Sequence, residues 1–287
     1  MKERGNWYAG FETVSNFRMY YRDWRPTKEG AGVPVVALHG FLTQGGMWCA
    51  TAEGTGRYRF VCPDQRGFGL SADPGKDDSA ADFARDVIEL VNVLRIDRFA
   101  VMGHSFAGAI ALRVAAAEPD RVAAVVLVDP TVSTRKANRE NLSAAQSRPE
   151  SFASLKEAED FFRKTEEGAW PGSPLKRFVR DVMIRDENGG PCRMPVQKER
   201  LIRLRNFQAS EQNDFLPFRL TEKVKCPVSI FRGGQSSRFA EGDARRLARA
   251  FRKGASLVNC AKSGHFPTVS ETDRVARELR KFLGGVT

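Results

Sequence analysis

The feature that most constrains this sequence is a serine in a tight turn between an apolar run and an alanine-rich run. Residues 99–102 (Phe-Ala-Val-Met) predict a buried strand, and residues 107–117 predict a helix. The pentapeptide Gly-His-Ser-Phe-Ala at 103–107 joins them. A strand that turns so sharply into a helix needs small neighbours and pushes the serine out above the sheet. Ser105 is therefore predicted to be a nucleophile, and Ala107 is small enough for a place that glycine usually takes.

Strand-length apolar runs alternate with helix-length segments along much of the chain, a pattern typical of βαβ units and a parallel sheet. The predicted strands cover 33–38, 59–62, 99–102, 122–128, 228–231 and 256–258, after an antiparallel hairpin of 10–14 and 17–21. The predicted helices cover 80–94, 107–117, 241–251 and 271–283.

Residues 131–225 interrupt this alternation. They carry amphipathic patterns, turns at Pro171-Gly172 and Asn188-Gly189-Gly190-Pro191, and no clear core strand, and they are too long for a simple loop. We predict an α/β fold with a core domain of residues 1–130 and 226–287. Residues 131–225 are predicted to form a helical cap domain.

The chain has three histidines that could activate Ser105. His265 stands on a predicted loop between the last strand and the final helix, from which a side chain can reach over the strand ends. His39 follows the strand 33–38 and is expected to shape its loop, while His104 is expected to point away from the serine. We therefore predict His265 as the base.

Two backbone N–H groups are predicted to form an oxyanion hole. One belongs to Phe41, in the loop after the strand 33–38, and the other to Phe106, directly after the nucleophile. Both groups follow strand ends, and the N-terminus of the helix 107–117 adds a favourable dipole for negative charge.

These motifs resemble those of the α/β-hydrolase fold superfamily over nearly the whole chain. The landmarks are His39-Gly40-Phe41, Asp64-Gln65-Arg66-Gly67-Phe68-Gly69-Leu70-Ser71, Gly103-His104-Ser105 and Gly264-His265-Phe266. The resemblance implies a mostly parallel twisted sheet flanked by helices, with an inserted cap. A serine nucleophile argues against the epoxide hydrolases and haloalkane dehalogenases of this fold, which use Asp. The fold itself says almost nothing about the substrate.

The acid of the triad departs from the common pattern of this superfamily. Many members place an Asp in a segment such as Arg-Gly-x-x-Ser-Asp after the post-cap strand, but here 232–238 reads Arg-Gly-Gly-Gln-Ser-Ser-Arg. A serine cannot offset the positive charge that forms on His265. Glu241 and Asp243 lie on the next predicted helix and are expected to face away. Asp129, at the end of the pre-cap strand, is therefore predicted to be the acid, with a turn cap as its alternative role.

An acid in this place is similar to that of 2-(acetamidomethylene)succinate hydrolase-like members, and fungal zearalenone lactonase also places its acid there. The first resemblance implies an anionic enamide substrate, and the second a lactone. We predict a serine hydrolase that cleaves an ester, lactone or amide bond of a small, possibly anionic, substrate. Two alternatives stay open, a carbon–carbon bond hydrolase or lyase with the same triad and a non-catalytic ligand receptor.

Composition sets the remaining expectations. The net charge of +11 comes from Lys and Arg dispersed among Asp and Glu, which favours a solvated surface, or a bias toward anionic substrates, over nucleic-acid binding. The five cysteines contain no Cys-x-x-Cys pair, which favours buried thiols over a metal site. We expect no cofactor, no metal and no membrane segment, and a cytoplasmic location; the sequence does not indicate an oligomeric state.

The cap is expected to set specificity through aromatic and basic side chains. We predict Trp48, Trp170 and Phe178 as pocket residues. Further aromatic residues that could join them or pack within helices are Phe161, Phe162 and Phe207. The arginines that could meet a substrate carboxylate are Arg177, Arg180, Arg203 and Arg205.

Overall fold

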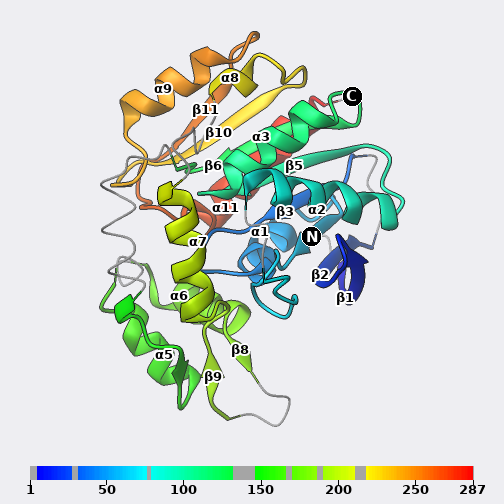
Figure 1. The fold of residues 1–287 in the computed structure, drawn as a ribbon. Helices are drawn as coiled ribbons and strands as arrows, with labels where there is room; N and C mark the ends of the chain where they lie inside the picture. The colour runs from blue at the N-terminus through cyan, green and yellow to red at the C-terminus, as the bar shows by residue number, and fades with distance from the viewer. Residues whose placement is uncertain are drawn as a thin grey trace.

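The computed structural model describes residues 5–27, 32–75, 79–131, 146–165, 170–185, 190–210 and 218–286, with the backbone only for 205–210. Its centre is an eight-stranded sheet in the order β1-β2-β4-β3-β5-β6-β10-β11 (Figure 1). β1 and β2 are antiparallel to each other, β2 is antiparallel to β4, and the other pairs are parallel. The strands are β1 (Gly5–Val14), β2 (Phe17–Pro26), β3 (Val35–Leu38), β4 (Phe60–Pro63), β5 (Phe99–His104), β6 (Val122–Val128), β10 (Val228–Gly233) and β11 (Ser256–Cys260).

Side chains of the inner strands alternate between two hydrophobic clusters, one on each face of the sheet. In β3, Val36 and Leu38 belong to the first cluster, whereas Val35 and Ala37 belong to the second. Successive residues of a strand point to opposite faces, so a strand covered on both sides reads as a continuous apolar run. Every residue of β3, β4, β5, β6 and β10 is buried, which explains why these runs were recognisable in the sequence.

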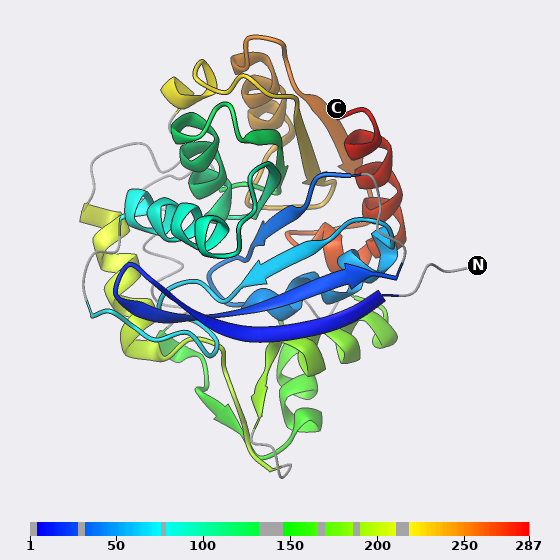
Figure 2. The same cartoon turned by 90° about the vertical axis from the view of Figure 1, so that its right-hand side faces the viewer.

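Helices cover both faces of the sheet (Figure 2). Helices α2 (Ala80–Val93), α3 (Ala107–Ala117) and α9 (Glu241–Ala250) contribute their apolar side chains to the first cluster. The second cluster receives apolar side chains from α1 (Cys49–Thr55), α10 (Pro267–Ser270) and α11 (Thr272–Gly284). The short helix η1 (Gly45–Trp48), which directly precedes α1, also contributes to it. The predicted α/β fold of a mostly parallel sheet flanked by helices is confirmed.

The segment between β6 and β10 contains helices and a small second sheet, and this small sheet lies below the main sheet in Figure 1. Its helices are α5 (Leu155–Phe162), α6 (Gly172–Val182), α7 (Lys198–Ser210) and α8 (Phe218–Thr221). Its strands are β7 (Ser151–Phe152), β8 (Ile184–Arg185) and β9 (Cys192–Arg193), paired antiparallel in the order β7-β9-β8.

The insertion carries the expected helices and, in addition, a small sheet that the sequence did not indicate. Each strand of the second sheet is two residues long, too short for an alternating apolar pattern to be visible in the sequence. The predicted turn at Asn188–Pro191 lies between β8 and β9, although part of it falls outside the described residues. The domain boundaries at 131 and 225 stay a prediction.

Among the described residues, the longest helices combine apolar and charged faces. None of them has a stretch long and apolar enough to cross a bilayer.

Candidate active site

Ser105 lies in a strained turn between β5 and α3. Its φ is +56°, a left-handed conformation that is uncommon for residues other than glycine. A Cβ atom on Gly103 would lie 2.2 Å from the carbonyl oxygen of Ala107, so only glycine fits there. The N–H of Ser105 donates to Val128 at 3.0 Å, and its carbonyl accepts from Gly108 at 3.0 Å. These contacts hold the serine at the carboxyl end of the central strands.

His265 lies within hydrogen-bonding distance of Ser105. Its Nε2 is 3.0 Å from Ser105 Oγ, and its Nδ1 is 2.7 Å from Asp129 Oδ2. A carboxylate on the Nδ1 side assigns the ring proton to Nδ1, which leaves Nε2 to accept the hydroxyl proton of the serine. Residues about 160 positions apart in the sequence thus form one chain of hydrogen bonds.

Asp129 directly follows β6 and is completely buried. Its N–H donates to the carbonyl of Phe231 at 2.7 Å, which extends the pairing of β6 with β10 by one residue. Its Oδ1 accepts from the N–H of Gly233 at 2.8 Å, and its Oδ2 accepts from Ser236 Oγ at 2.5 Å as well as from His265. Glu241 and Asp243, the two other acids considered, lie in the first turn of α9, where Glu241 pairs with Arg245.

Two hydroxyl groups at this site were not identified from the sequence. Thr131 Oγ1 lies 2.9 Å from Ser105 Oγ, and Ser236 contacts Asp129 as described above. Because Ser105 donates its one proton to His265, Thr131 must donate to Ser105. The position of Thr131, two residues after Asp129, is the sequence signal that could have indicated it.

His39 stabilises the loop that follows β3. Its Nε2 accepts from the N–H of Gln65 at 2.9 Å, and its Nδ1 lies 2.8 Å from the carbonyl oxygen of Gly40. Burial lowers the pKa of His39 to about 3, so the ring is neutral at ordinary pH. Its contacts with Gly40 and Gln65 hold the loop after β3 together, in agreement with the expected loop-shaping role.

His104 is buried, and its Nε2 lies 2.8 Å from the carbonyl oxygen of His265. Burial, and next the proximity of His265, lower the pKa of His104 well below its usual value. The neutral ring therefore donates Nε2–H to the backbone of the base. This contact fixes the loop that carries His265.

Phe41 and Phe106, the predicted oxyanion-hole residues, lie side by side. Their rings stack with centroids 4.1 Å apart and an interplanar angle of 22°. Phe41 follows β3 and Phe106 follows Ser105 after β5, and these two strands are parallel neighbours. Both backbones consequently meet at the carboxyl edge of the sheet, next to the nucleophile.

Two of the three predicted pocket residues lie close to the base. Trp170 and Phe178 pack against Phe266, the neighbour of His265, with ring centroids 5.3 and 5.8 Å from it. All three predicted pocket residues are buried in the second cluster, and Trp48, at 0% exposure, is the most deeply buried of them. Phe161 and Phe162 extend the aromatic contacts along α5, and the side chain of Phe207 lies outside the described residues.

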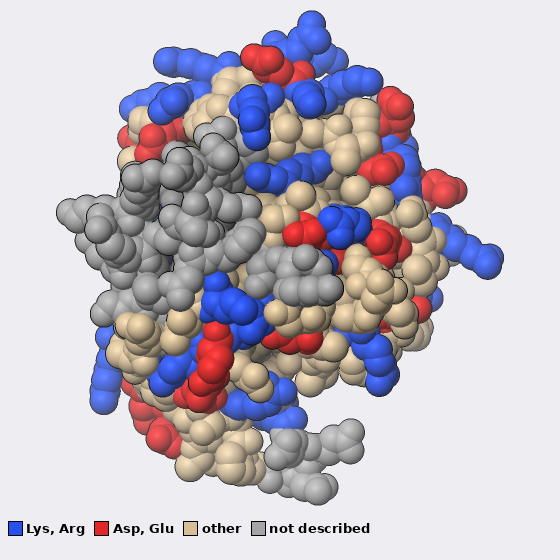
Figure 3. Space-filling view, viewed as in Figure 1, with Lys and Arg blue, Asp and Glu red and all other residues tan. Residues whose placement is uncertain are grey.

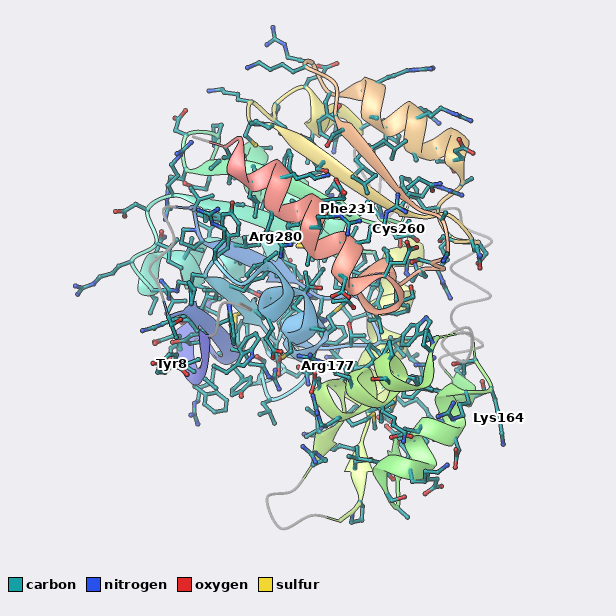
Figure 4. The ribbon with its side chains drawn as sticks, turned by 180° about the vertical axis from the view of Figure 1, so that it is seen from behind. Tyr8, Lys164, Arg177, Phe231, Cys260 and Arg280 are labelled. Carbon is teal, nitrogen blue, oxygen red and sulfur yellow. The ribbon has the colours of Figure 1, made fainter. Side chains whose placement is uncertain are left out.

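The predicted carboxylate-binding arginines pair with acids of the chain itself. Arg177 binds Glu53 of α1 at 2.8 Å and also Asp181 at 3.2 Å, at the junction of α6 and α1 seen from behind in Figure 4. Arg180 also pairs with Asp181, at 2.9 Å. Arg203 pairs with Asp73, and the side chain of Arg205 lies outside the described residues.

One cavity among the described residues, an open groove of 1570 Å³, lies away from the triad. It lies between α1, α6 and α11, and its lining includes Arg177 and Arg280, both labelled in Figure 4. None of Ser105, Asp129 and His265 lines it. The chemistry of the triad, and not the size of this groove, therefore locates the candidate active site.

Comparisons with known proteins identify the fold family. A family model described as alpha/beta hydrolase fold matches residues 33–180, slightly more than half of the chain. An uncharacterized protein of Mycobacterium tuberculosis is 30% identical over 129 residues, 45% of this chain. That match covers 36% of the relative, so the chain spans about a third of the length of the first curated relatives it matches.

Two further similarities extend over most of the chain. RutD of Klebsiella pneumoniae, a candidate carbamate hydrolase, is 29% identical over 252 residues, which are 84% of this chain and 88% of that protein. The crystal structure of E-2-(acetamidomethylene)succinate hydrolase matches 98% of this chain and 100% of its own chain, with a TM-score of 0.83 and 18% identity. At that identity the similarity shows a shared fold.

Proposed function

Because the chain belongs to the α/β-hydrolase fold family, we propose that it is a serine hydrolase that cleaves an ester, lactone or amide bond of a small organic substrate. The observation that carries the proposal is the unbroken chain of hydrogen bonds from Asp129 through His265 to Ser105, with distances of 2.7 and 3.0 Å. The fold alone does not carry it, because this fold supports many unrelated activities.

In the proposed reaction, Ser105 Oγ attacks the carbonyl carbon while His265 Nε2 takes the hydroxyl proton. The backbone N–H groups of Phe41 and Phe106 stabilise the oxyanion, and Asp129 stabilises the imidazolium. His265 then returns the proton to the leaving oxygen or nitrogen, which leaves an acyl group on Ser105. Water, activated by the same histidine, releases the acid and restores the serine.

The aromatic surroundings of the base support an apolar group next to the scissile bond. Trp170 and Phe178 surround Phe266, directly beside His265, and they come from the segment inserted between β6 and β10. Arg177, Arg180 and Arg203 already pair with acids of the chain, so these ion pairs give no support to these three arginines as binders of a substrate carboxylate. On the face shown in Figure 3, Lys and Arg are spread among acidic groups over the surface.

A panel of p-nitrophenyl esters tests the proposal through pre-steady-state bursts and steady-state rates. The wild type should release a burst of p-nitrophenol that matches the enzyme concentration, because acylation by such an activated ester is faster than deacylation and the acyl-enzyme accumulates. Ser105→Ala should abolish the burst, and Asp129→Asn should lower kcat by about 10³- to 10⁴-fold. Turnover by Ser105→Ala at the wild-type rate would contradict the proposal. Product analysis on amide, lactone and 1,3-diketone substrates then separates acyl transfer from carbon–carbon cleavage.

A further inference from the structure

The loop after β10 supplies a hydroxyl group directly to the acid of the triad. Ser236 Oγ donates to Asp129 Oδ2 at 2.5 Å, the same oxygen that accepts from His265 Nδ1 at 2.7 Å. Ser236 is buried, and Asp129 is completely inaccessible to solvent. The carboxylate therefore has two donors on Oδ2 and the N–H of Gly233 on Oδ1.

The chemistry of the carboxylate fixes the direction of the hydrogen bond between Ser236 and Asp129, and the other contacts of Ser236 are compatible with it. An ionised carboxylate has no proton to give, so the hydroxyl must be the donor. The N–H of Arg238 donates to Ser236 Oγ at 3.2 Å and occupies a lone pair of the hydroxyl oxygen. The N–H of Ser236 donates to the carbonyl of Gly233 at 3.0 Å, which closes the turn.

This turn is also attached to the loop that carries the base. The N–H of Gln235 donates to the carbonyl of Ser263 at 2.8 Å, two residues before His265. A Cβ atom on Gly233 would lie 1.8 Å from the carbonyl oxygen of Gly264, so the two backbones are in close contact. Ser236 thus stands on a segment that is hydrogen-bonded to both the acid and the base loop.

We propose that Ser236 is a positioning residue that holds the Asp129 carboxylate in the orientation in which Oδ2 meets His265 Nδ1. The torsion about the terminal bond of an aspartate has a broad minimum, so the carboxylate needs donors on both oxygens to stay in one plane. Gly233 fixes Oδ1 and Ser236 fixes Oδ2. The inference rests on the proposed function, since it assigns a role to Ser236 within that triad.

Kinetics of three single variants test this role. Ser236→Ala should lower kcat by about 10- to 100-fold, the range seen when a group that orients a reactive side chain is removed, with KM within about twofold. Ser236→Thr keeps the hydroxyl and should restore most of kcat. The matched control is Ser229→Ala on β10, which removes another buried serine hydroxyl, one that contacts Ser256 and not the triad. The control should behave as the wild type.

A double variant separates a specific role from a general loss of structure. If Ser236 acts through the Asp129 carboxylate, Ser236→Ala should change kcat by less than about twofold in an Asp129→Asn background. An equal loss in both backgrounds, or wild-type kcat in Ser236→Ala, would overturn the proposal.

Proton NMR gives a readout that does not depend on turnover. The low-field resonance of the His265 Nδ1 proton should move in Ser236→Ala and stay in place in Ser229→Ala. An unmoved resonance in Ser236→Ala would overturn the positioning role even if Ser105 proves to be the nucleophile. A loss of burst in Ser105→Ala together with a moved resonance supports both proposals, whereas full activity of Ser105→Ala contradicts only the proposed function.

Discussion

Ser105 and Asp129 both have left-handed backbone conformations, with φ of +56° and +41°. They follow the adjacent parallel strands β5 and β6, and neither is a glycine. Such conformations cost about 1–3 kcal/mol each and persist where surrounding contacts fix them. Here the contacts are the backbone bonds from Ser105 to Val128 and from Asp129 to Phe231. The neighbouring strands therefore stabilise both strained residues and aim their side chains at the same histidine.

The free energy of unfolding should depend on pH because His39 is buried in its neutral form. Its pKa is about 3 in the folded protein and about 6.5 in the unfolded chain, so below pH 6.5 the unfolded state binds a proton that the folded state does not. The free energy of unfolding should therefore fall by about 1.4 kcal/mol per pH unit for this group as the pH drops from 6.5 toward 3.

Urea unfolding at several pH values measures this slope. His39→Gln should be less stable at pH 7, because the ring bonds to Gln65 and Gly40 are altered, but its slope between pH 6 and 4 should be smaller by about 1.4 kcal/mol per pH unit. His104 is present in both proteins and contributes equally to each. Identical slopes would show that His39 is protonated in the folded state.

The site residues that could be predicted from the sequence were those that stand in a recognisable motif or at the end of an apolar run. Ser105 and His265 stood in motifs, and Asp129 followed an apolar run that ended at the sheet edge. The sequence showed a serine near the place where many members of the superfamily have the acid. The hydrogen bond from Ser236 to Asp129 could not be predicted, because it depends on β6 and β10 being neighbours in the sheet. The burial of Trp48 depends likewise on helix packing that no local pattern of the sequence specifies.

At the level of elements, α6 is attached to the loop that carries Phe41 through one glutamine. Gln44 Nε2 donates to the carbonyls of Asp181 and Val182 at 2.9 and 3.0 Å, at the end of α6. The last carbonyls of a helix have no partner within the helix, so this side chain satisfies two of them. A Cβ atom on Gly46 would lie 1.9 Å from the carbonyl oxygen of Asp181, which shows how closely the two backbones approach.

Replacing Gln44 should therefore destabilise the protein and disturb the active site. Gln44→Leu leaves two poorly solvated carbonyls without a donor, and we expect the free energy of unfolding to fall by about 2–3 kcal/mol in urea titrations. kcat/KM should fall too, since Phe41 lies three residues away. The control is Arg180→Ala, which removes an exposed ion pair with Asp181 and should cost less than about 1 kcal/mol. Equal effects of both variants would contradict the role of Gln44.

The observed bounds of helices with a strong periodic pattern agree well with the predicted bounds, whereas very short elements were not predicted. The helix α2 begins at a capping box, in which Ser79 and Asp82 bond each other's backbone N–H groups, and it ends within one residue of its predicted limit. The hairpin β1–β2 is longer than predicted, because its pairing continues from Val14 and Phe17 back to Gly5 and Pro26. The four-residue helix α10 and the two-residue strands carry too little pattern to be predicted.

For the whole molecule, the second hydrophobic cluster joins the inserted segment to the main sheet. It contains Phe162 and Leu175 of the insertion together with Phe60 and Phe231 of the sheet. Contacts between polar groups, such as the ion pair of Arg177 with Glu53, cross the same boundary. A continuous apolar cluster favours a single cooperative transition in which neither part exposes its surface alone.

The buried cysteines offer a direct test of this cooperativity. Cys192 lies in β9 of the insertion, while Cys62 and Cys260 lie in the main sheet, and all three belong to the second cluster. Burial raises the pKa of each thiol, to about 12 for Cys260, so these cysteines should react with iodoacetamide only after unfolding. Pulse labelling across a urea series, with peptide mass spectrometry, should give the same midpoint for Cys192 and Cys62.

Cys226, which precedes β10 and is only partly buried, serves as the control that becomes labelled first. Labelling of Cys192 at a urea concentration that leaves Cys62 and Cys260 protected would mean that the insertion opens by itself. Such an opening would expose Trp170 and Phe178 and release the aromatic contacts on Phe266 next to the base. Activity would then be lost at a lower urea concentration than the one at which the main sheet unfolds. In a single transition, activity and the main sheet would be lost at the same urea concentration.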